Sequence, residues 1–384
     1  MLEFINAANL NFVLRCIYKF QHLKIRKYFI VLRRTIITLC CLLYAAGGFA
    51  QTNAQRADEL HAAVYKYLYN SKTKLFIQTS DPAKNNNLHA DLWGLCALIQ
   101  AANEMERLHP GKSYMQPVVA AIDQYYDPIP PAPGYASYVV SERREDRYYD
   151  DNQWIGIAYL DAWQRTRKKS FMQKGDEIYR FMMTGYDTIT GGGLYWKEGD
   201  KTTKNTCSNG PGILLALQLY EATHKKAYLD TAMLLYNWVN KYLRDPQGVY
   251  WDAIKPEEHN RIDSAVYTYN TGTMLEANVK LYRITRNAQY LKEAQTIAAG
   301  SYARFFHNGR FNSSYWFNAV LLRGYEALYK VDNDKRYINA MQTYADNVWE
   351  QDRDKRNNML GKRPEKELLG QAGMMEIYAR LATL

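Results

Sequence analysis

Asn209-Gly-Pro-Gly-Ile-Leu-Leu-Ala-Leu-Gln-Leu-Tyr220 and Asn270-Thr-Gly-Thr-Met-Leu-Glu-Ala-Asn-Val-Lys-Leu-Tyr282 are two copies of one pattern. Each copy begins on an asparagine, continues as an apolar stretch rich in small residues, and is followed after a short polar turn by a second apolar-periodic stretch. The second stretches are Ala222–Ala232 and Ile284–Ala294, and the two copies align without a gap from their closing tyrosines onward. Apolar residues recur here with a period of 3.6 and show almost no alternation, which indicates helices. We therefore predict an all-α protein built from repeated helical hairpins.

The repeat predicts a closed ring. The last start, Leu369–Leu381, leaves no room for a second helix, while the chain past residue 50 opens on an unpaired amphipathic helix, Ala54–Tyr69. These two halves complete each other only if the ends meet, which predicts an (α/α)6 barrel of six helical hairpins, with the first helix of each pair inside. An open solenoid is the alternative, but it usually carries capping repeats and a stricter period. The six starts lie near His89, Asn152, Asn209, Asn270, Asn318 and Gln371.

Composition and charge narrow the function classes. The 384 residues are 47% hydrophobic and 23% charged, which suits a globular protein with a large core. The formal charge of +10 looks like a nucleic-acid signal, but the first fifty residues carry seven Lys/Arg against one acid, Glu3. The remaining chain is only mildly basic. This balance argues against a phosphate-binding groove and against attraction to a membrane surface.

Residues 1–50 have the pattern of a signal or leader segment. A basic stretch, Lys24–Arg34, precedes an apolar run, Thr35–Phe49, that ends on Gly48-Phe49-Ala50. We expect cleavage after Ala50, export to the periplasm or the medium, and a single catalytic domain over residues 51–384 that is monomeric and has no membrane contact. An uncleaved anchor is the alternative. Cys96 and Cys207 remain after cleavage, and we interpret them as buried free thiols.

Aromatic, glycine-rich loops precede the expected inner helices. Gly191-Gly-Gly-Leu-Tyr-Trp196 and Gly248-Val-Tyr-Trp251 precede two of them, and flat aromatic faces in a cleft suit stacking on the C–H faces of sugars. The alternative role is that of buried core aromatics. Asparagines and a tyrosine at inner-helix starts could bind sugar hydroxyls, or could cap and pack helices. The stacking candidates are Trp93, Trp196 and Trp251, and the hydroxyl-binding candidates are Asn209, Tyr269 and Asn270.

Two adjacent acids, Asp150 and Asp151, stand at the start of the second inner helix in Arg147-Tyr-Tyr-Asp-Asp-Asn-Gln-Trp154. An aspartate in a first helical turn is ordinary, since it accepts backbone N–H bonds. Retaining glycoside hydrolysis, however, needs two carboxyl groups about 5 to 5.5 Å apart, which neighbouring residues can reach. The helix terminus would favour the ionised form of one aspartate, while repulsion between the two groups and burial would raise the pKa of the other. The residues alone do not assign the two roles.

Four motifs in this order resemble glycoside hydrolase family 76, the α-1,6-mannanases, over roughly residues 55–384. They are Tyr148-Tyr-Asp-Asp-Asn-Gln-Trp154, Lys204-Asn-Thr-Cys-Ser-Asn209, Tyr267-Thr-Tyr-Asn-Thr-Gly272 and Trp316-Phe-Asn-Ala-Val-Leu-Leu-Arg323.

The resemblance implies an (α/α)6 barrel that cleaves the α-1,6-linked mannan backbone internally, with retention of configuration and without a cofactor. By the same resemblance Asp150 is the nucleophile and Asp151 the acid/base. The chain departs from the family pattern at Thr271, where the family often has glutamine, and at Asp91, an acid not expected at the first inner helix.

Other chemistries have less support in the sequence. The seven histidines show no HExxH pattern, so we expect no metal site, and no GxSxG motif occurs. Two alternatives stay open. One is another carbohydrate enzyme on the same barrel, such as an unsaturated glucuronyl hydrolase or an epimerase, and the other is a noncatalytic mannan-binding or carbohydrate-binding protein.

Overall fold

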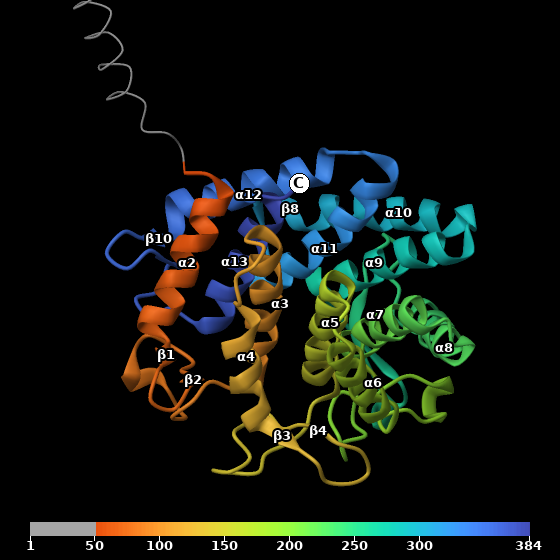
Figure 1. Ribbon diagram of the computed structural model, residues 1–384. Helices are drawn as coiled ribbons and strands as arrows, with labels where there is room; N and C mark the ends of the chain where they lie inside the picture. Colours follow the sequence, from red (N-terminus) through yellow and green to blue (C-terminus); the bar gives the residue numbers. More distant parts are fainter. Residues whose placement is uncertain (1–50) are drawn as a thin grey trace, which may run out of the picture. The chain divides into compact units, whose positions relative to one another are not determined.

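Twelve α-helices arranged as an inner and an outer layer make up the computed structural model, which describes residues 51–384 (Figure 1). The expected (α/α)6 barrel of six helical hairpins is confirmed. The expected leader, residues 1–50, lies outside the described residues. The inner helices are α3 (Leu92–Leu108), α5 (Tyr149–Thr166), α7 (Thr206–Thr223), α9 (Thr268–Thr285), α11 (Tyr315–Asp332) and α13 (Leu368–Leu381). The outer helices are α2 (Asn53–Tyr67), α4 (Met115–Ile122), α6 (Lys169–Met183), α8 (Lys226–Tyr242), α10 (Ala288–Phe305) and α12 (Arg336–Asp352).

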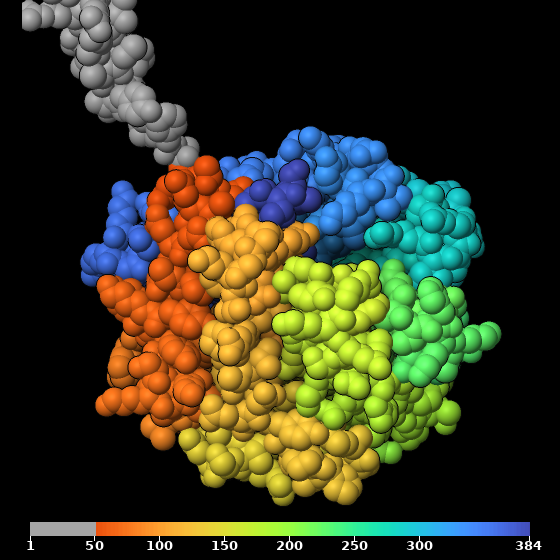
Figure 2. All heavy atoms as spheres, viewed as in Figure 1, coloured from red at the N-terminus to blue at the C-terminus, as the bar shows by residue number. Residues whose placement is uncertain are grey.

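The ring closes where the two ends of the barrel meet. The last inner helix, α13, packs against both α2 and α3, so the unpaired first and last helices form the sixth hairpin. In the outer layer, the Asn53 side chain of α2 donates a hydrogen bond to Gln342 of α12 at 2.7 Å. Figure 2 shows the first helix of the barrel lying beside C-terminal residues. The closed ring leaves no open end that would need a capping repeat.

Successive inner helices end in the same way. The residue after each of α5, α7, α9 and α11 adopts the left-handed conformation, with φ between 56° and 60°, and its N–H bonds back to the carbonyl four residues earlier. This stop satisfies a terminal carbonyl and turns the chain sharply. The four end residues are Arg167, His224, Arg286 and Asn333. They form the short polar turns that the sequence repeat indicated.

An asparagine or glutamine near the start of three inner helices, α5, α7 and α13, ties the helix to the loop before it. The Asn152 amide exchanges hydrogen bonds with the backbone of Tyr135 at 2.7 and 2.9 Å. Asn209 does the same with Leu194, and Gln371 with Leu360. Each side chain thereby acts like one residue of a strand pair. This structural role accounts for Asn152, Asn209 and Gln371 among the recurring residues.

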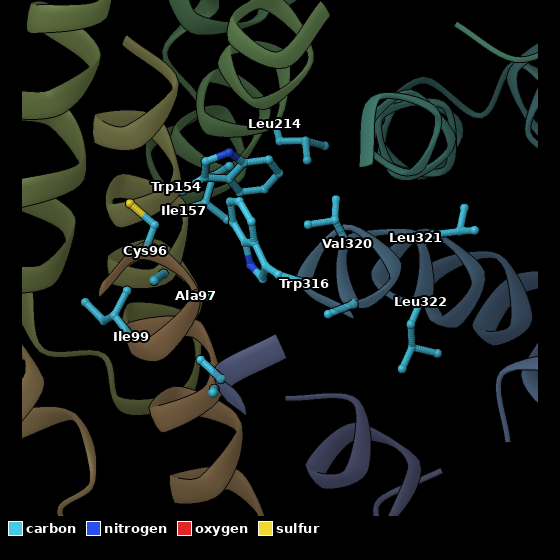
Figure 3. Packing of buried hydrophobic residues seen from close by; sticks show 14 of the residues in the cluster. Cys96, Ala97, Ile99, Trp154, Ile157, Leu214, Trp316, Val320, Leu321 and Leu322 are labelled. Carbon is cyan, nitrogen blue, oxygen red and sulfur yellow. The ribbon is translucent and has the colours of Figure 1, made fainter. Parts of the chain in front are cut away.

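The centre of the barrel is packed with aromatic and aliphatic side chains. Trp154 of α5 and Trp316 of α11 meet edge to face with their ring centroids 5.4 Å apart, and both are almost completely buried (Figure 3). The Trp316 indole donates to Gln100 of α3 at 3.3 Å, so three inner helices meet at this point. Trp154 and Trp316 also line the cleft described below, so their packed rings lie at its base.

Gly272 of α9 sets the distance between two inner helices. A Cβ atom at this position would lie 2.7 Å from the Leu321 Cα and 2.8 Å from the Val320 carbonyl oxygen of α11. Backbone atoms cannot swing aside, so the helices would have to separate. We expect Gly272→Ala to lower the free energy of unfolding by about 1–3 kcal/mol in urea titrations. Gly370→Ala is the control, because its Cβ would meet only a tyrosine ring at 3.4 Å. Equal stability of the two variants would contradict this account.

Short antiparallel strands connect the helices, and the sequence did not predict them. The largest sheet has the order β5-β6-β7 and lies beside the starts of α7 and α9. The strands are β1 (Tyr69–Asn70), β2 (Leu75–Phe76), β3 (Tyr126–Asp127), β4 (Gly134–Tyr135), β5 (Lys204–Asn205), β6 (Trp251–Lys255), β7 (Arg261–Val266), β8 (Phe306–His307), β9 (Arg310–Phe311), β10 (Arg353–Asp354) and β11 (Met359–Leu360).

Candidate active site

A cleft of about 900 Å³ opens at the rim where the inner helices begin. This volume is at the upper end of the range for ligand pockets. Its walls come from the starts of five inner helices, from the loop before α5, and from the sheet β5-β6-β7. Its lining includes Asn87, Asp91, Trp93, Arg143, Glu145, Asp150, Asp151, Trp196, Asn205, Cys207, Asp252, Tyr267, Tyr269 and Phe317.

The adjacent acids Asp150 and Asp151 lie in the first turn of α5 and both line the cleft. The start of α5 is fixed by the Tyr149 N–H, which donates to the Trp196 carbonyl oxygen at 3.0 Å. The side chains emerge at the N-terminal end of the helix, where the helix dipole favours negative charge.

Asp150 is surrounded by hydrogen-bond donors. The Trp196 indole N–H donates to its Oδ2 at 3.1 Å, the Asp151 backbone N–H to its Oδ1 at 3.1 Å, and the Cys207 thiol also donates to it. Burial raises the pKa of Asp150 to about 6, although these hydrogen bonds favour the ionised form and oppose the rise. The donors thus favour the ionised form of this carboxyl group.

Asp151 lies in a different environment. Its side chain is only 8% exposed, and among residues 51–384 no hydrogen-bond donor to its carboxylate is found. Burial, the charge of Asp150 and the charge of Asp91 raise its pKa well above the usual range. The two neighbouring carboxyl groups thus lie in different environments: hydrogen-bond donors surround Asp150, whereas burial and neighbouring negative charge raise the pKa of Asp151.

Exposed aromatic rings gather in the cleft. Trp93, Trp196 and Tyr267 are 43%, 40% and 37% exposed, and all three line it. Elsewhere in residues 51–384, Tyr302 is the one aromatic side chain among the exposed large hydrophobic residues. Tyr269 also lines the cleft, where it stacks on Phe317 with the ring centroids 3.9 Å apart. The cleft therefore offers flat apolar faces next to polar groups.

The structure places three of the predicted substrate-binding residues outside the cleft lining. Asn209 is fully buried, and its amide is used by the backbone of Leu194 and Asn205, which is the packing role given above as its alternative. Asn270 is also buried, and donates to Asp252 at 3.2 Å. Trp251 lies on β6 next to a bulge, and it is the following residue, Asp252, that lines the cleft.

Asp252 is a site residue that the sequence reasoning missed. Burial raises its pKa, while amide hydrogen bonds from Asn270 and Asn205 oppose the rise. The signal available in the sequence was its place directly after the aromatic loop Gly248–Trp251. Asp91 also lines the cleft, although the sequence assigned it no role.

Within residues 51–384, no group of three or more His, Cys, Asp or Glu side chains is arranged to hold a metal ion. Cys96 and Cys207 are both buried and free, as expected. None of the helices in this part of the chain combines the length and apolar character that a membrane crossing needs.

Comparisons with known proteins agree with this architecture. The mannan endo-1,6-alpha-mannosidase DCW1 of Saccharomyces cerevisiae is 26% identical over 182 residues, which are 42% of this chain and only 39% of the yeast protein. The family 76 mannosidase Bt3792 of Bacteroides thetaiotaomicron superposes with a TM-score of 0.78 and 26% identity, covering 86% of this chain and 98% of that chain.

A third similar structure is that of an alpha-1,6-mannanase from Salegentibacter sp., solved as an inactive variant with two consecutive aspartates changed to asparagine, in complex with alpha-1,6-mannotriose. It superposes with a TM-score of 0.74 at 21% identity, covering 86% of this chain and 99% of that chain. The profile of glycosyl hydrolase family 76 matches residues 52–383, which is nearly all of the described barrel. The resemblance drawn from the four sequence motifs is thereby confirmed, and the chain belongs to glycosyl hydrolase family 76.

Proposed function

We propose that this protein is a retaining, endo-acting glycoside hydrolase that cleaves α-1,6-mannosidic bonds in a mannan backbone. The observation that carries the proposal is the pair of neighbouring acids, Asp150 and Asp151, which line one cleft in different environments. Retaining hydrolysis requires one carboxyl group that acts as an anion and one that acts as an acid, and the donors around Asp150 and the raised pKa of Asp151 favour this division. The α-1,6 specificity is taken from the named relatives, and the mannotriose complex of the Salegentibacter enzyme supports it.

In the first step, ionised Asp150 is the nucleophile. Its carboxylate attacks the anomeric carbon while Asp151 donates its proton to the departing glycosidic oxygen, through a transition state with oxocarbenium character. The C–O bond to the leaving sugar breaks, and an ester between the mannosyl unit and Asp150 forms. The donors around Asp150 fix the orientation of its carboxylate toward the bound sugar.

In the second step, Asp151 acts as the base. It has lost its proton to the leaving group, so it can accept a proton from a water molecule that attacks the same anomeric carbon. The ester bond to Asp150 breaks, and the product leaves with the original α configuration. Two successive inversions at one carbon give this net retention.

Trp93, Trp196 and Tyr269 supply the sugar-stacking and hydroxyl-binding surface in this proposal. Since the lining of the cleft extends past the acid pair both toward α3 and toward β6, a chain could bind with sugars on both sides of the cut. This arrangement supports internal cleavage. We also propose that residues 51–384 act as a single, monomeric catalytic domain exported behind the leader, without a cofactor.

The hydrogen bond from Trp196 to Asp150 should influence how the activity depends on pH. Trp196→Phe removes an N–H that stabilises the ionised form of Asp150, so the pKa of Asp150 should rise above its value of about 6. Activity requires Asp150 ionised, and the acid limb of kcat/KM should therefore move to higher pH. Trp93→Phe is the control, because Trp93 contacts the aromatic residues Trp316 and Phe317. An unmoved acid limb in Trp196→Phe, measured on mannotetraose, would contradict this role.

Incubation with unbranched α-1,6-mannan tests the function itself. The protein should release short manno-oligosaccharides early in the reaction, as chromatography shows, and Asp151→Asn should release almost none. Binding of mannan without products from the wild-type protein would favour a noncatalytic carbohydrate-binding protein. Neither binding nor cleavage would mean that the barrel serves another sugar.

A further inference from the structure

We propose that Asp91 binds hydroxyl groups of the leaving-group sugar, and that the mannan chain therefore lies with its reducing-end side toward α3. This inference rests on the proposed function, because it assigns a direction to the chain in the same cleft. It follows from the way in which the surroundings of the two catalytic acids differ.

The carboxylate of Asp91 is directed to the cleft and not to its own helix. Asp91 occupies the N-cap position of α3, where an aspartate usually accepts a backbone N–H bond, but here it makes no such side-chain bond. Its Oδ1 accepts instead from the Asn87 amide at 3.1 Å, and both residues line the cleft. Among residues 51–384, no hydrogen-bond partner is found for its Oδ2. A half-buried carboxylate oxygen in this position is available to accept from a ligand hydroxyl.

Asp91 lies on the side of the acid, Asp151. The first turns of α3 pack against the start of α5, where the Cys96 thiol donates to the Asp151 carbonyl oxygen at 3.2 Å. The charge of Asp91 contributes to the raised pKa of Asp151. In a retaining reaction the acid protonates the oxygen of the leaving group, so the sugar beyond that oxygen lies past the acid.

The nucleophile faces the other half of the cleft. Asp150 contacts Trp196 and Cys207, and beyond Cys207 the wall continues to Tyr269 and Asp252. The sugar that is attacked, and those on its non-reducing side, therefore lie toward the sheet β5-β6-β7. The half of the cleft beside Asp151 therefore binds the leaving-group sugar, and the half beside Asp150 binds the sugar that is attacked. This arrangement determines the direction of the mannan chain.

The wall around Asp91 is suited to hydroxyl groups. Arg143 donates to the Asn87 side-chain oxygen at 3.1 Å, Asn87 donates to Asp91, and Arg143 also pairs with Glu145. This network holds the Asn87 amide and the Asp91 carboxylate in fixed orientations. A carboxylate so held can accept hydrogen bonds from two neighbouring hydroxyls of one sugar. This arrangement suits the hydroxyl groups of a mannose unit in the proposed substrate.

Asp91→Asn tests the proposal with two substrates that differ in their leaving group. The leaving group of α-1,6-mannotetraose is a sugar. The leaving group of the α-fluoride of α-1,6-mannobiose is fluoride, so this substrate places no sugar beside Asp91. We expect kcat/KM for the tetraose to fall by about 10- to 100-fold, the size of a lost hydrogen bond to a charged group. The fall for the fluoride should be at least about 10-fold smaller. Asn87→Ala should give the same pattern with a smaller loss.

Transfer to an added sugar gives a second readout. An acceptor occupies the leaving-group position when it attacks the mannosyl-enzyme, so Asp91→Asn should lower the ratio of transfer to hydrolysis when the fluoride reacts in the presence of mannobiose. A merely structural defect would lower both products together. Asp146→Asn is the matched control, since Asp146 pairs with Lys197 outside the lining of the cleft.

Equal losses on the tetraose and the fluoride, or no loss on the tetraose, would overturn the assignment of Asp91. A wild-type protein that turns over neither substrate would overturn the proposed function itself. The two failures are therefore distinguishable, because the first is seen only with an active wild-type enzyme.

Discussion

Asp150→Ala and Asp151→Ala should both lose mannan hydrolysis, but by different amounts and with different responses to azide. Without Asp150 no ester forms, and we expect kcat to fall by about 10⁴-fold or more, as when a nucleophile is removed. Loss of the acid/base should cost about 10²- to 10⁴-fold. The defect of Asp151→Ala should be much smaller in the first step with a mannosyl fluoride, because fluoride departs without a proton.

Azide should then separate the two roles by the configuration of the product. In Asp151→Ala, azide can replace the missing base-activated water and attack the mannosyl-enzyme, giving an α-mannosyl azide. In Asp150→Ala, azide can occupy the space of the missing carboxylate and attack the α-fluoride from the opposite face, giving a β-mannosyl azide. NMR of the products distinguishes the two anomers.

Asp146→Ala is the control for these variants, since Asp146 is paired with Lys197 and does not line the cleft. It should keep wild-type turnover and give no azide product. Exchanged configurations between the two variants would reverse the roles of Asp150 and Asp151. Near wild-type hydrolysis by either variant would remove the acid pair from the mechanism.

Arg380→Met should be the most destabilising of the substitutions considered. Arg380 of α13 is buried, and its guanidinium contacts three carboxylates from three inner helices, Glu104 at 3.0 Å, Glu326 at 2.9 Å and Glu376 at 2.8 Å. Removing the cation leaves these negative charges buried with less compensation. Breaking a buried ion pair in this way costs about 3–5 kcal/mol. Urea unfolding at pH 7 should show a loss of this size.

The loss should depend on pH. Although burial raises the pKa of Glu326, the charges of Arg380, Lys330 and Arg107 hold it well below its usual value. Such a group stabilises the fold above the pKa of the unfolded state, and this contribution is lost as the pH falls. The deficit of Arg380→Met relative to the wild type should therefore shrink as the pH falls below 4.5, the ordinary pKa of a glutamate.

Arg336→Met is the matched control, because Arg336 is exposed and pairs with Asp334 at 2.6 Å. Exposed pairs contribute about 0–1 kcal/mol. Equal effects of the two Arg→Met changes would contradict the view that the buried ion network ties α3, α11 and α13 together.

The barrel could be predicted from the sequence because the features that determine it lie within single helical hairpins. The hydrophobic period and the small residues recur along the chain, and left-handed helix stops such as His224 and Arg286 end four successive inner helices. Ring closure followed from the two unmatched end helices. The acid pair could also be predicted, because Asp150 and Asp151 are adjacent in the chain and occupy one helical turn.

The rest of the site depends on contacts between distant segments. Asp252 reaches the cleft because β6 pairs with β5, with Ala253 opposite Asn205. No short-range pattern in the sequence predicts this pairing. The asparagine at a helix start is ambiguous for a related reason. The sequence around Asn209 does not distinguish an amide that binds a sugar from one that bonds to the Leu194 backbone. The position of the folded loop determines which of these contacts forms.

The order of the two acids likewise depends on tertiary contacts. The indole of Trp196 and the thiol of Cys207 reach Asp150, whereas Asp91 lies on the side of Asp151. These groups come from three separate loops or helices. Their different effects on the two carboxyl groups could not be derived from the adjacent positions of the acids alone.

The central claim is retention of configuration by the neighbouring carboxyl groups Asp150 and Asp151, and proton NMR of the first products from α-1,6-mannotetraose tests it most directly. The account predicts that the newly formed reducing end appears as the α anomer and only later equilibrates with the β anomer. Initial appearance of the β anomer would contradict it, because a single inversion would leave no role for Asp150 as a nucleophile.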